Sequence, residues 1–276
     1  MNHTRGPIRF AVQGRRPVPG TRRRTTEWRH AVAMAATLLA TPPTGAADQH
    51  AAERTEYRAS RAAIAPVIDG LGNDAAWQEA RWRDIDQRWL GPEHDESDFQ
   101  GRYRVVWTQE RIYILVEIVD DILFDAHRDP LIQYWDDDCL EIFLDEDFSG
   151  GGHQYSHNAF AYHVALDNQV IDIGTDQAAR SYSHHVQSRW RQQGKELVWE
   201  LAIDVYPDSY RDDAPDNRPV RLSAEKVLGL MVAYCDNDGS ELRENFIGSE
   251  AVDQGKKDRG WIDANIFGKL VLDENK

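Results

Sequence analysis

The stretch YWDDDCLEIFLDED, from Tyr134 to Asp147, alternates in character with the two-residue period of a β-strand. Every second side chain is apolar and the set between is mixed: Leu140, Ile142 and Leu144 alternate with Cys139, Glu141 and Phe143. This pattern predicts a strand with one face in a core and the other face available for other contacts. Trp135 and the aspartates before the strand are therefore candidates for the edge of a site.

The same period continues over most of the chain, from Ile64 to Leu272. Alternating runs at 112–119, 160–166, 197–203 and 228–234 are separated by turn sequences rich in Gly, Asn and Asp, such as those at 149–152 and 236–239. Runs with one apolar face are typical of antiparallel strands that have one solvated side. The sequence predicts an all-β domain, a two-sheet antiparallel β-sandwich with little helix.

The sandwich is expected to begin with a strand near Tyr57–Ala65. The helical signal is limited to one short helix through Ala75–Arg81, which Asp74 could cap and which would bury Trp77. Three tryptophans fall on core-facing positions and are interpreted as structural: Trp77, Trp107 and Trp199.

The N-terminus has the order of a secretory signal peptide. An Arg-rich lead precedes a short apolar run, AVAMAATLLA, and small residues suited to cleavage near Ala46 or Ala47. Residues 1–47 are therefore assigned to a signal peptide, 48–56 to a polar linker and 57–273 to the domain. The apolar run is too short for a membrane span. The protein is expected to be exported, either to the periplasm or out of the cell.

The chain beyond the expected signal peptide is strongly acidic. Of 32 basic and 47 acidic residues, eight arginines but only Glu27 fall within residues 1–47, which leaves 24 basic against 46 acidic residues. Such a surface repels phosphate backbones and anionic lipids, so nucleic acid is not expected as a partner. Neutral polyols, cations or basic proteins match this charge better.

Two cysteines, Cys139 and Cys235, remain after the expected signal peptide, and both lie in predicted strands. An exported protein could pair them in a disulfide, or they could be two buried thiols. The sequence leaves both alternatives open.

An exposed tryptophan beside a carboxylate suits sugar binding, because the C–H-rich face of a pyranose stacks on an indole and hydroxyls donate to carboxylates. Trp135 and Glu141 have this combination. The alternative is that Trp135 packs half-buried under a loop and that the neighbouring aspartates are solvated.

Four segments, in order, carry a resemblance that covers nearly all of residues 57–273: PVIDGLGNDAAW (66–77), YRVVWTQERIYILVEIVDD (103–121), WDDDCLEIFLDED (135–147) and RGWIDANIFGKLVL (259–272). They resemble the family 9 carbohydrate-binding modules. The resemblance implies a jelly-roll-like sandwich without catalytic activity, in which two tryptophans clamp a sugar. It also implies recognition of mono- and disaccharides or polysaccharide chain ends, with calcium as a structural aid.

Carried over by position, the resemblance assigns Trp135 and Trp261 to the clamp, Glu141 to accepting sugar hydroxyls and Asp258 to a polar contact before the second tryptophan. The family has an arginine and an asparagine on the strand after SGGG, whereas this strand reads NAFAYHVALDN, without arginine. Three residues of that strand are candidates to replace them: Asn158, Tyr162 and His163. Trp82 and Trp89 are further candidates for stacking on a sugar.

Two turns could hold a hard cation. The DNDG turn places Asp236 and Asp238 close together, as a calcium ligand set requires, although a solvated turn is an equal alternative. The run Asp136–Asp138 is either a second calcium platform or a negative rim. Three histidines, His153, His157 and His163, raise zinc as an alternative. A zinc site needs three or four ligands that converge on one point.

The leading interpretation is an exported, noncatalytic carbohydrate-binding protein that supports carbohydrate catabolism, with a separate glycoside hydrolase as a partner. The first alternative is a glycosidase, which needs two carboxyl groups at about 5 Å or about 6.5–9.5 Å, and no spacing here singles out such a pair. The second is a haem-binding sandwich, for which Met231 is the sole methionine after the expected signal peptide. No other organic cofactor is expected.

Overall fold

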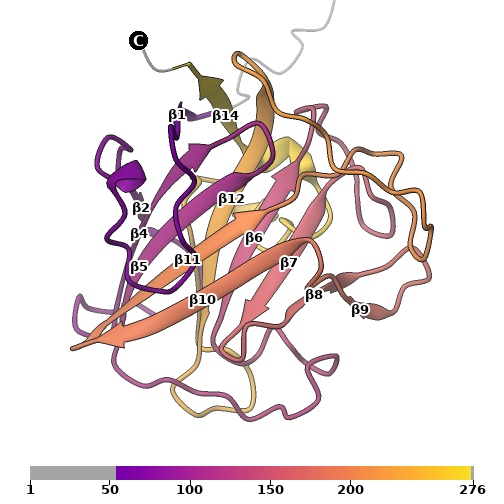
Figure 1. The fold of residues 1–276 in the computed structure, drawn as a ribbon. Coiled ribbons are helices and arrows are strands. Elements are labelled where there is room, and N and C mark those ends of the chain that lie inside the picture. The colour runs from indigo at the N-terminus through magenta and orange to yellow at the C-terminus, as the bar shows by residue number, and fades with distance from the viewer. Residues whose placement is uncertain (1–53, 275–276) are drawn as a thin grey trace, which may run out of the picture. The chain divides into compact units, whose positions relative to one another are not determined.

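The structure is a computed structural model that describes residues 54–274 (Figure 1). The predicted signal peptide and residues 48–53 of the predicted linker lie outside the described residues. The described chain folds into fourteen strands: β1 (Glu56–Arg61), β2 (Arg83–Ile85), β3 (Gln87–Leu90), β4 (Phe99–Trp107), β5 (Ile112–Asp120), β6 (Cys139–Asp145), β7 (Phe160–Ala165), β8 (Val170–Ile173), β9 (Ala179–Ser181), β10 (Val186–Gln193), β11 (Glu196–Ile203), β12 (Val227–Asp236), β13 (Asn245–Gly248) and β14 (Gly268–Asp273). Three 3-10 helices, of three residues each, complete the elements: η1 (Ala75–Trp77), η2 (Gln254–Lys256) and η3 (Ala264–Ile266).

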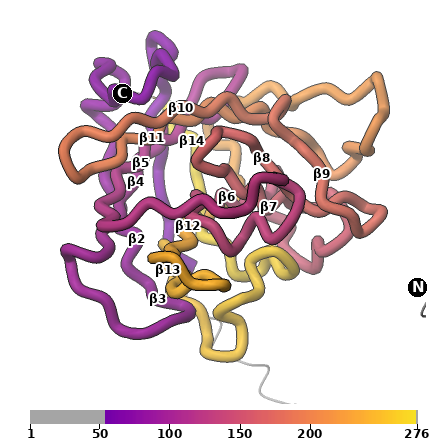
Figure 2. Tube along the Cα trace, turned by 90° about the horizontal axis from the view of Figure 1, so that it is seen from below, coloured from indigo at the N-terminus to yellow at the C-terminus, as the bar shows by residue number. Residues whose placement is uncertain are grey.

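Eleven of the described strands follow one hydrogen-bonded path, β10-β11-β5-β4-β1-β14-β12-β6-β7-β8-β9, which turns back on itself (Figure 1). Strand β2 pairs with β4, and β13 pairs with β12 and β3. Strands β10, β11, β5 and β4 form one layer, and β14, β12, β6 and β7 form the other. Figure 1 shows β10 and β11 passing in front of β6 and β7. Figure 2 shows β13, with β3 beside it, on the side of β12 away from β10 and β11.

The predicted all-β sandwich is confirmed, with one difference. Strand β1 runs parallel to both of its neighbours, β14 and β4, while the other pairs are antiparallel. Side-chain periodicity reports which face of a strand is buried and carries no information about strand direction, so the sequence pattern could not reveal this.

The main core lies between the two layers and is built from the apolar sets that the sequence pattern indicated. Trp107 and Trp199 from one layer are buried together with Leu140, Ile142 and Tyr162 from the other. The indole N–H of Trp199 donates to Ser188 Oγ at 2.7 Å, and that of Trp107 donates to the Asp273 carbonyl at 2.9 Å. Both tryptophans are structural, as predicted, since each ring is buried and its N–H is satisfied.

The predicted helix at 75–81 is reduced to the single turn η1. Asp74 makes no capping hydrogen bond, because its Oδ2 accepts the backbone N–H of Val67 instead. Trp77 is buried as expected and donates to the carboxylate of Glu200 at 2.9 Å. Within residues 54–274, no helix has the length and apolar character that crossing a membrane requires.

Candidate functional site

A pocket of about 230 Å³ lies on the outer face of the second layer, where the mixed side-chain set of β6 points. Trp135, Trp261, Glu141, His163 and Asp258 all line it. The structure thus brings together five of the residues that the sequence assigned to a sugar site. The rest of the lining is Tyr134, Phe143, Asp172, Ile173, Arg243, Phe246 and Gly260.

Trp135 lies in the loop that enters β6 and is 40% exposed, so the indole is available to a ligand. Its ring packs edge-on against Tyr134, with centroids 4.9 Å apart, and Tyr134 packs edge-on against His163 at 4.7 Å. Tyr134 itself is buried. The buried Tyr134 therefore fixes the base of the loop, while Trp135 remains partly exposed to solvent.

Trp261 is supplied by the loop between η2 and η3. Its neighbour Gly260 packs so closely on the sheet that an added Cβ would lie 2.6 Å from the ring of Phe143. His153 donates from Nε2 to the Gly260 carbonyl at 2.7 Å and is buried. These contacts hold the loop, and with it the partly buried Trp261, against the pocket.

Glu141 is the most buried polar group of the pocket, at 2% exposed. Its Oε1 lies 3.0 Å from His163 Nε2 and 3.2 Å from Arg243 Nη1, and it accepts from Cys235 Sγ at 2.9 Å. Burial acts to raise the pKa of Glu141, but His163 and Arg243 outweigh it and bring the pKa below its ordinary value. Glu141 is therefore an ionised hydrogen-bond acceptor at neutral pH.

Arg243, which sequence reasoning missed, connects two of the three acidic side chains of the pocket. Besides Glu141, its Nη2 donates to Asp258 Oδ1 at 3.1 Å, and its guanidinium lies 4.1 Å from the centroid of the Phe246 ring. It lies in the connection between β12 and β13, a loop for which the two-residue strand period makes no prediction. A cation therefore does line this pocket, although the strand NAFAYHVALDN contains none.

The three aspartates before β6 are buried and bind backbone, so they are not a solvated rim. Asp137 accepts the N–H groups of Ala126 and His127 at 3.0 and 2.8 Å. Asp138 accepts those of Phe124 and Asn237, and Asp136 accepts that of Arg243 at 3.2 Å. Together they fix the loops that carry Trp135 and Arg243, which explains why so much negative charge precedes the strand.

The three sugar-contact candidates on β7 and in the segment before it lie in different places, and only one lines the pocket. His163 lines the pocket, while Tyr162, one residue earlier, points into the core and hydrogen-bonds His185. Asn158 donates to the Gly150 carbonyl at 2.6 Å and is not among the pocket-lining residues. Asp172 on β8 also lines the pocket, and desolvation raises its pKa to about 7. No sequence motif pointed to Asp172.

The two aspartates of the DNDG turn lie close to a third aspartate, Asp120. Oxygens of Asp120, Asp236 and Asp238 lie within 4.8 Å of one another. Burial first, and then neighbouring carboxylates, raise the pKa of Asp236 to about 8. Asp238 Oδ1 is shielded from solvent and has no hydrogen-bond partner. An oxygen cluster of this kind, with one unsatisfied atom, fits a hard cation such as calcium.

The three histidines weighed for zinc have separate surroundings. His153 binds the Gly260 carbonyl, His163 faces Glu141, and His157 Nε2 lies 3.2 Å from Asp212. They do not converge on one point among residues 54–274. Cys139 and Cys235 are free, buried thiols.

The two other tryptophans proposed for stacking are engaged elsewhere. Trp89 is buried, packs edge-on against Phe246 and donates to the Glu250 carbonyl. The ring of Trp82 is covered by the guanidinium groups of Arg102 and Arg104, at 4.3 and 4.2 Å.

A larger, open depression of about 720 Å³ lies on another part of the surface, between Arg61 and Arg221. Its charged side chains are largely paired, Arg111 with Asp204 and Arg221 with Glu110. The smaller pocket, with two tryptophans over a buried carboxylate, is the better candidate for recognising a ligand.

Comparison with known proteins settles the family. A model described as "Carbohydrate family 9 binding domain-like" matches residues 68–275, about three quarters of the chain. The chain belongs to this family. The resemblance drawn from the four sequence segments is therefore confirmed, and the family is one of carbohydrate-binding domains.

A curated relative is the endo-1,4-beta-xylanase A of Thermotoga neapolitana, 23% identical over 208 residues, which are 75% of this chain and 17% of the xylanase. This chain thus spans about a sixth of that relative. Two solved family 9 modules from Caldicellulosiruptor kristjanssonii, one with cellotriose and one with glucose, superpose with TM-scores of 0.60 and 0.58 at 18% identity. They cover 80% and 79% of this chain, and 95% and 97% of the modules. The agreement shows that the fold is shared.

Proposed function

We propose that this protein is a noncatalytic carbohydrate-binding domain that holds a sugar between Trp135 and Trp261. The observation that carries the proposal is that both tryptophans and the buried carboxylate of Glu141 line one pocket. A sugar ring presents apolar C–H faces and a polar equator, and these match two indoles and a charged acceptor.

The polar groups have distinct roles in this proposal. Glu141 accepts from a sugar hydroxyl, and the charge of the carboxylate strengthens that hydrogen bond. Arg243 holds Glu141 and Asp258 at a fixed separation, so the acceptors are in place before the sugar arrives. The pocket is smaller than the roughly 300–1,000 Å³ typical of sites for drug-sized ligands, which favours one or two sugar rings over a long chain segment.

The same contacts support a binding role over hydrolysis. A glycosidase needs one carboxyl group free to donate a proton and another free to attack or to activate water. Here Arg243 is paired with both Glu141 and Asp258. His163 and Arg243 hold Glu141 ionised as an acceptor, a poor arrangement for a general acid, whereas burial raises the pKa of Asp258 despite its pairing with Arg243.

Glucose and cello-oligosaccharides are the first ligands to test, because the superposed modules were solved with glucose and cellotriose. The xylanase relative adds xylo-oligosaccharides. Isothermal titration of the purified full chain with glucose, cellotriose and xylotriose is expected to give saturable binding with one site per chain. Inositol serves as a polyol control. A flat response to every sugar of the panel would contradict the proposal.

We also propose a calcium ion at Asp120, Asp236 and Asp238. The convergence of their oxygens and the unsatisfied Oδ1 of Asp238 support it. The ion would neutralise mutually repelling carboxylates on the loops at the ends of β5 and β12, and so stabilise the fold.

Calcium at a hundredfold excess over its dissociation constant is expected to raise the melting temperature by about 5–10 °C, from the linkage relation and typical unfolding entropies. Asp238→Asn should abolish this rise, while Asp216→Asn, at a mostly exposed aspartate, should retain it. Differential scanning calorimetry in calcium and in EDTA measures both. Equal melting temperatures in the two buffers would exclude the calcium site.

Export and the partner enzyme belong to the same proposal and are supported by the sequence alone. The N-terminal pattern is the support for export. A domain that only binds sugar turns nothing over, so a separate glycoside hydrolase would act on the polysaccharide it holds.

A further inference from the structure

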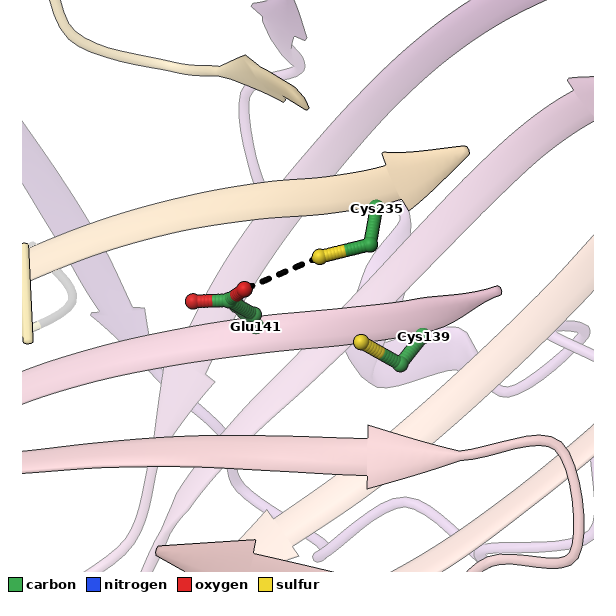
Figure 3. Close-up of side chains that lie close together, drawn as sticks. All are labelled: Cys139, Glu141 and Cys235. Atoms are coloured by element: carbon green, nitrogen blue, oxygen red, sulfur yellow. Dashed lines mark hydrogen bonds between the residues drawn. The ribbon is translucent and has the colours of Figure 1, made fainter. Parts of the chain in front are cut away.

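Two thiols face each other directly behind the pocket. Cys139 on β6 and Cys235 on β12 are register partners in an antiparallel pair, so both side chains leave the sheet on the same face. They are 1% and 0% exposed. Figure 3 shows the two side chains with Glu141, from which a dashed line runs to Cys235 Sγ.

This placement suits a covalent bond. Directly opposed residues of antiparallel strands have Cα atoms about 4.5–5.5 Å apart, within the 4.4–6.8 Å range of disulfides. The two sulfurs and a Glu141 oxygen already lie within 4.8 Å of one another. Rotation about the Cα–Cβ bonds moves the sulfurs toward each other, and closure further needs the Cβ atoms to approach from about 4.5–5.5 Å, as in opposed residues, to about 3.5–4.5 Å, as in a disulfide.

One of the two thiols, that of Cys235, also contacts residues that line the pocket. Cys235 Sγ donates to Glu141 Oε1 at 2.9 Å, and Arg243 Nη1 lies 3.1 Å from the same sulfur. A change at Cys235 therefore reaches two residues that line the pocket.

We propose that Cys139 and Cys235 are a redox modification site, in which closure of a cross-strand disulfide releases Glu141 and tightens sugar binding. Two thiols lose two protons and two electrons as the S–S bond forms, and a disulfide oxidant such as oxidised glutathione is reduced to two thiols. The S–H donor to Glu141 is then gone, which leaves an acceptor position for a sugar hydroxyl. The second half of this inference rests on the proposed function, while disulfide formation does not.

Burial makes exchange in the folded protein slow, so the full chain is refolded in a glutathione buffer, once oxidising and once reducing. Thiols are counted with a maleimide under denaturing conditions by mass spectrometry. The expected result is no free thiol in the oxidised sample and two in the reduced one. The melting temperature should rise by roughly 5 °C or more on oxidation, because the bond closes a long loop.

Sugar affinity is then measured on both forms by titration, with an expected gain of about threefold on oxidation, the size of one modest hydrogen bond. Cys139→Ala is the matched control, because it cannot form the bond yet keeps the Cys235 contact with Glu141. It should bind as the reduced wild type does in both buffers.

Two free thiols after oxidative refolding would overturn the redox site. A disulfide with unchanged or weaker sugar affinity would overturn the coupling to Glu141. If the disulfide forms and neither form binds any sugar, the proposed function fails and the coupling with it, while the thiol count still supports the covalent site.

Discussion

Replacing Trp261 with alanine is expected to lower the affinity for the bound sugar by at least about tenfold, and Trp135→Ala should have a similar effect. Each indole lines the pocket and has an exposed face. Aromatic stacking contributes about 0.5–1.5 kcal/mol in addition to area burial, and 1.4 kcal/mol corresponds to a factor of ten. The loss should be larger for the double variant, because both faces of the sugar then meet water.

Trp82→Ala is the matched control for this experiment, since it removes an indole that lies under Arg102 and Arg104 and outside the pocket. Titration calorimetry gives the affinities, and circular dichroism confirms that each variant is folded. If the pocket variants bind as tightly as wild type and Trp82→Ala, the sugar is held elsewhere on the protein.

Replacing Glu200 with alanine is expected to destabilise the fold by about 3–5 kcal/mol, because buried donors left without acceptors are costly. Glu200 is fully buried on β11 and accepts three hydrogen bonds. Two come from the backbone of Asp69 and Gly70, at 3.0 and 2.8 Å, and one from the Trp77 indole at 2.9 Å. It is thus the anchor of the segment PVIDGLGNDAAW.

Urea unfolding followed by tryptophan fluorescence measures this loss. Glu200→Gln keeps an acceptor oxygen and should be affected less, whereas Glu196→Ala, at the exposed start of the same strand, should change stability by under about 0.5 kcal/mol. Equal unfolding midpoints for Glu200→Ala and Glu196→Ala would contradict the anchoring role.

The conformation of the same segment explains why it contains glycine at position 70. Gly70 has φ of +79°, and an added Cβ would lie 2.8 Å from the backbone of Trp190. A side chain is excluded both by the backbone conformation and by space. The sequence shows this segment as a motif but gives no reason for it, since the partner Glu200 lies 130 residues away.

Strands and their buried faces were predictable because the period of two is local. Leu140, Ile142 and Leu144 point into the core, while Glu141 and Phe143 line the pocket on the opposite face. Trp135 was a candidate from its place just before the strand, but its pairing with Trp261 in one clamp came from the resemblance to a family, since neither residue lies in a strand whose periodicity could place it.

Features that depend on long-range contacts were not predictable. Arg243 reaches the pocket because Asp136, 107 residues earlier, accepts its backbone N–H. The aspartates before β6 were interpreted as either a calcium platform or a negative rim, yet they satisfy backbone donors of neighbouring loops. A charged run on a surface and a charged run that ties loops together have the same sequence, and only the fold distinguishes them.

The most direct test of the central claim is a crystal structure of the protein soaked with cellotriose, or with whichever sugar of the panel binds most tightly. The account predicts density for a sugar ring in contact with both Trp135 and Trp261, with a hydroxyl within hydrogen-bond distance of Glu141. A sugar ring bound at another surface, with this pocket empty at a saturating concentration, would contradict it.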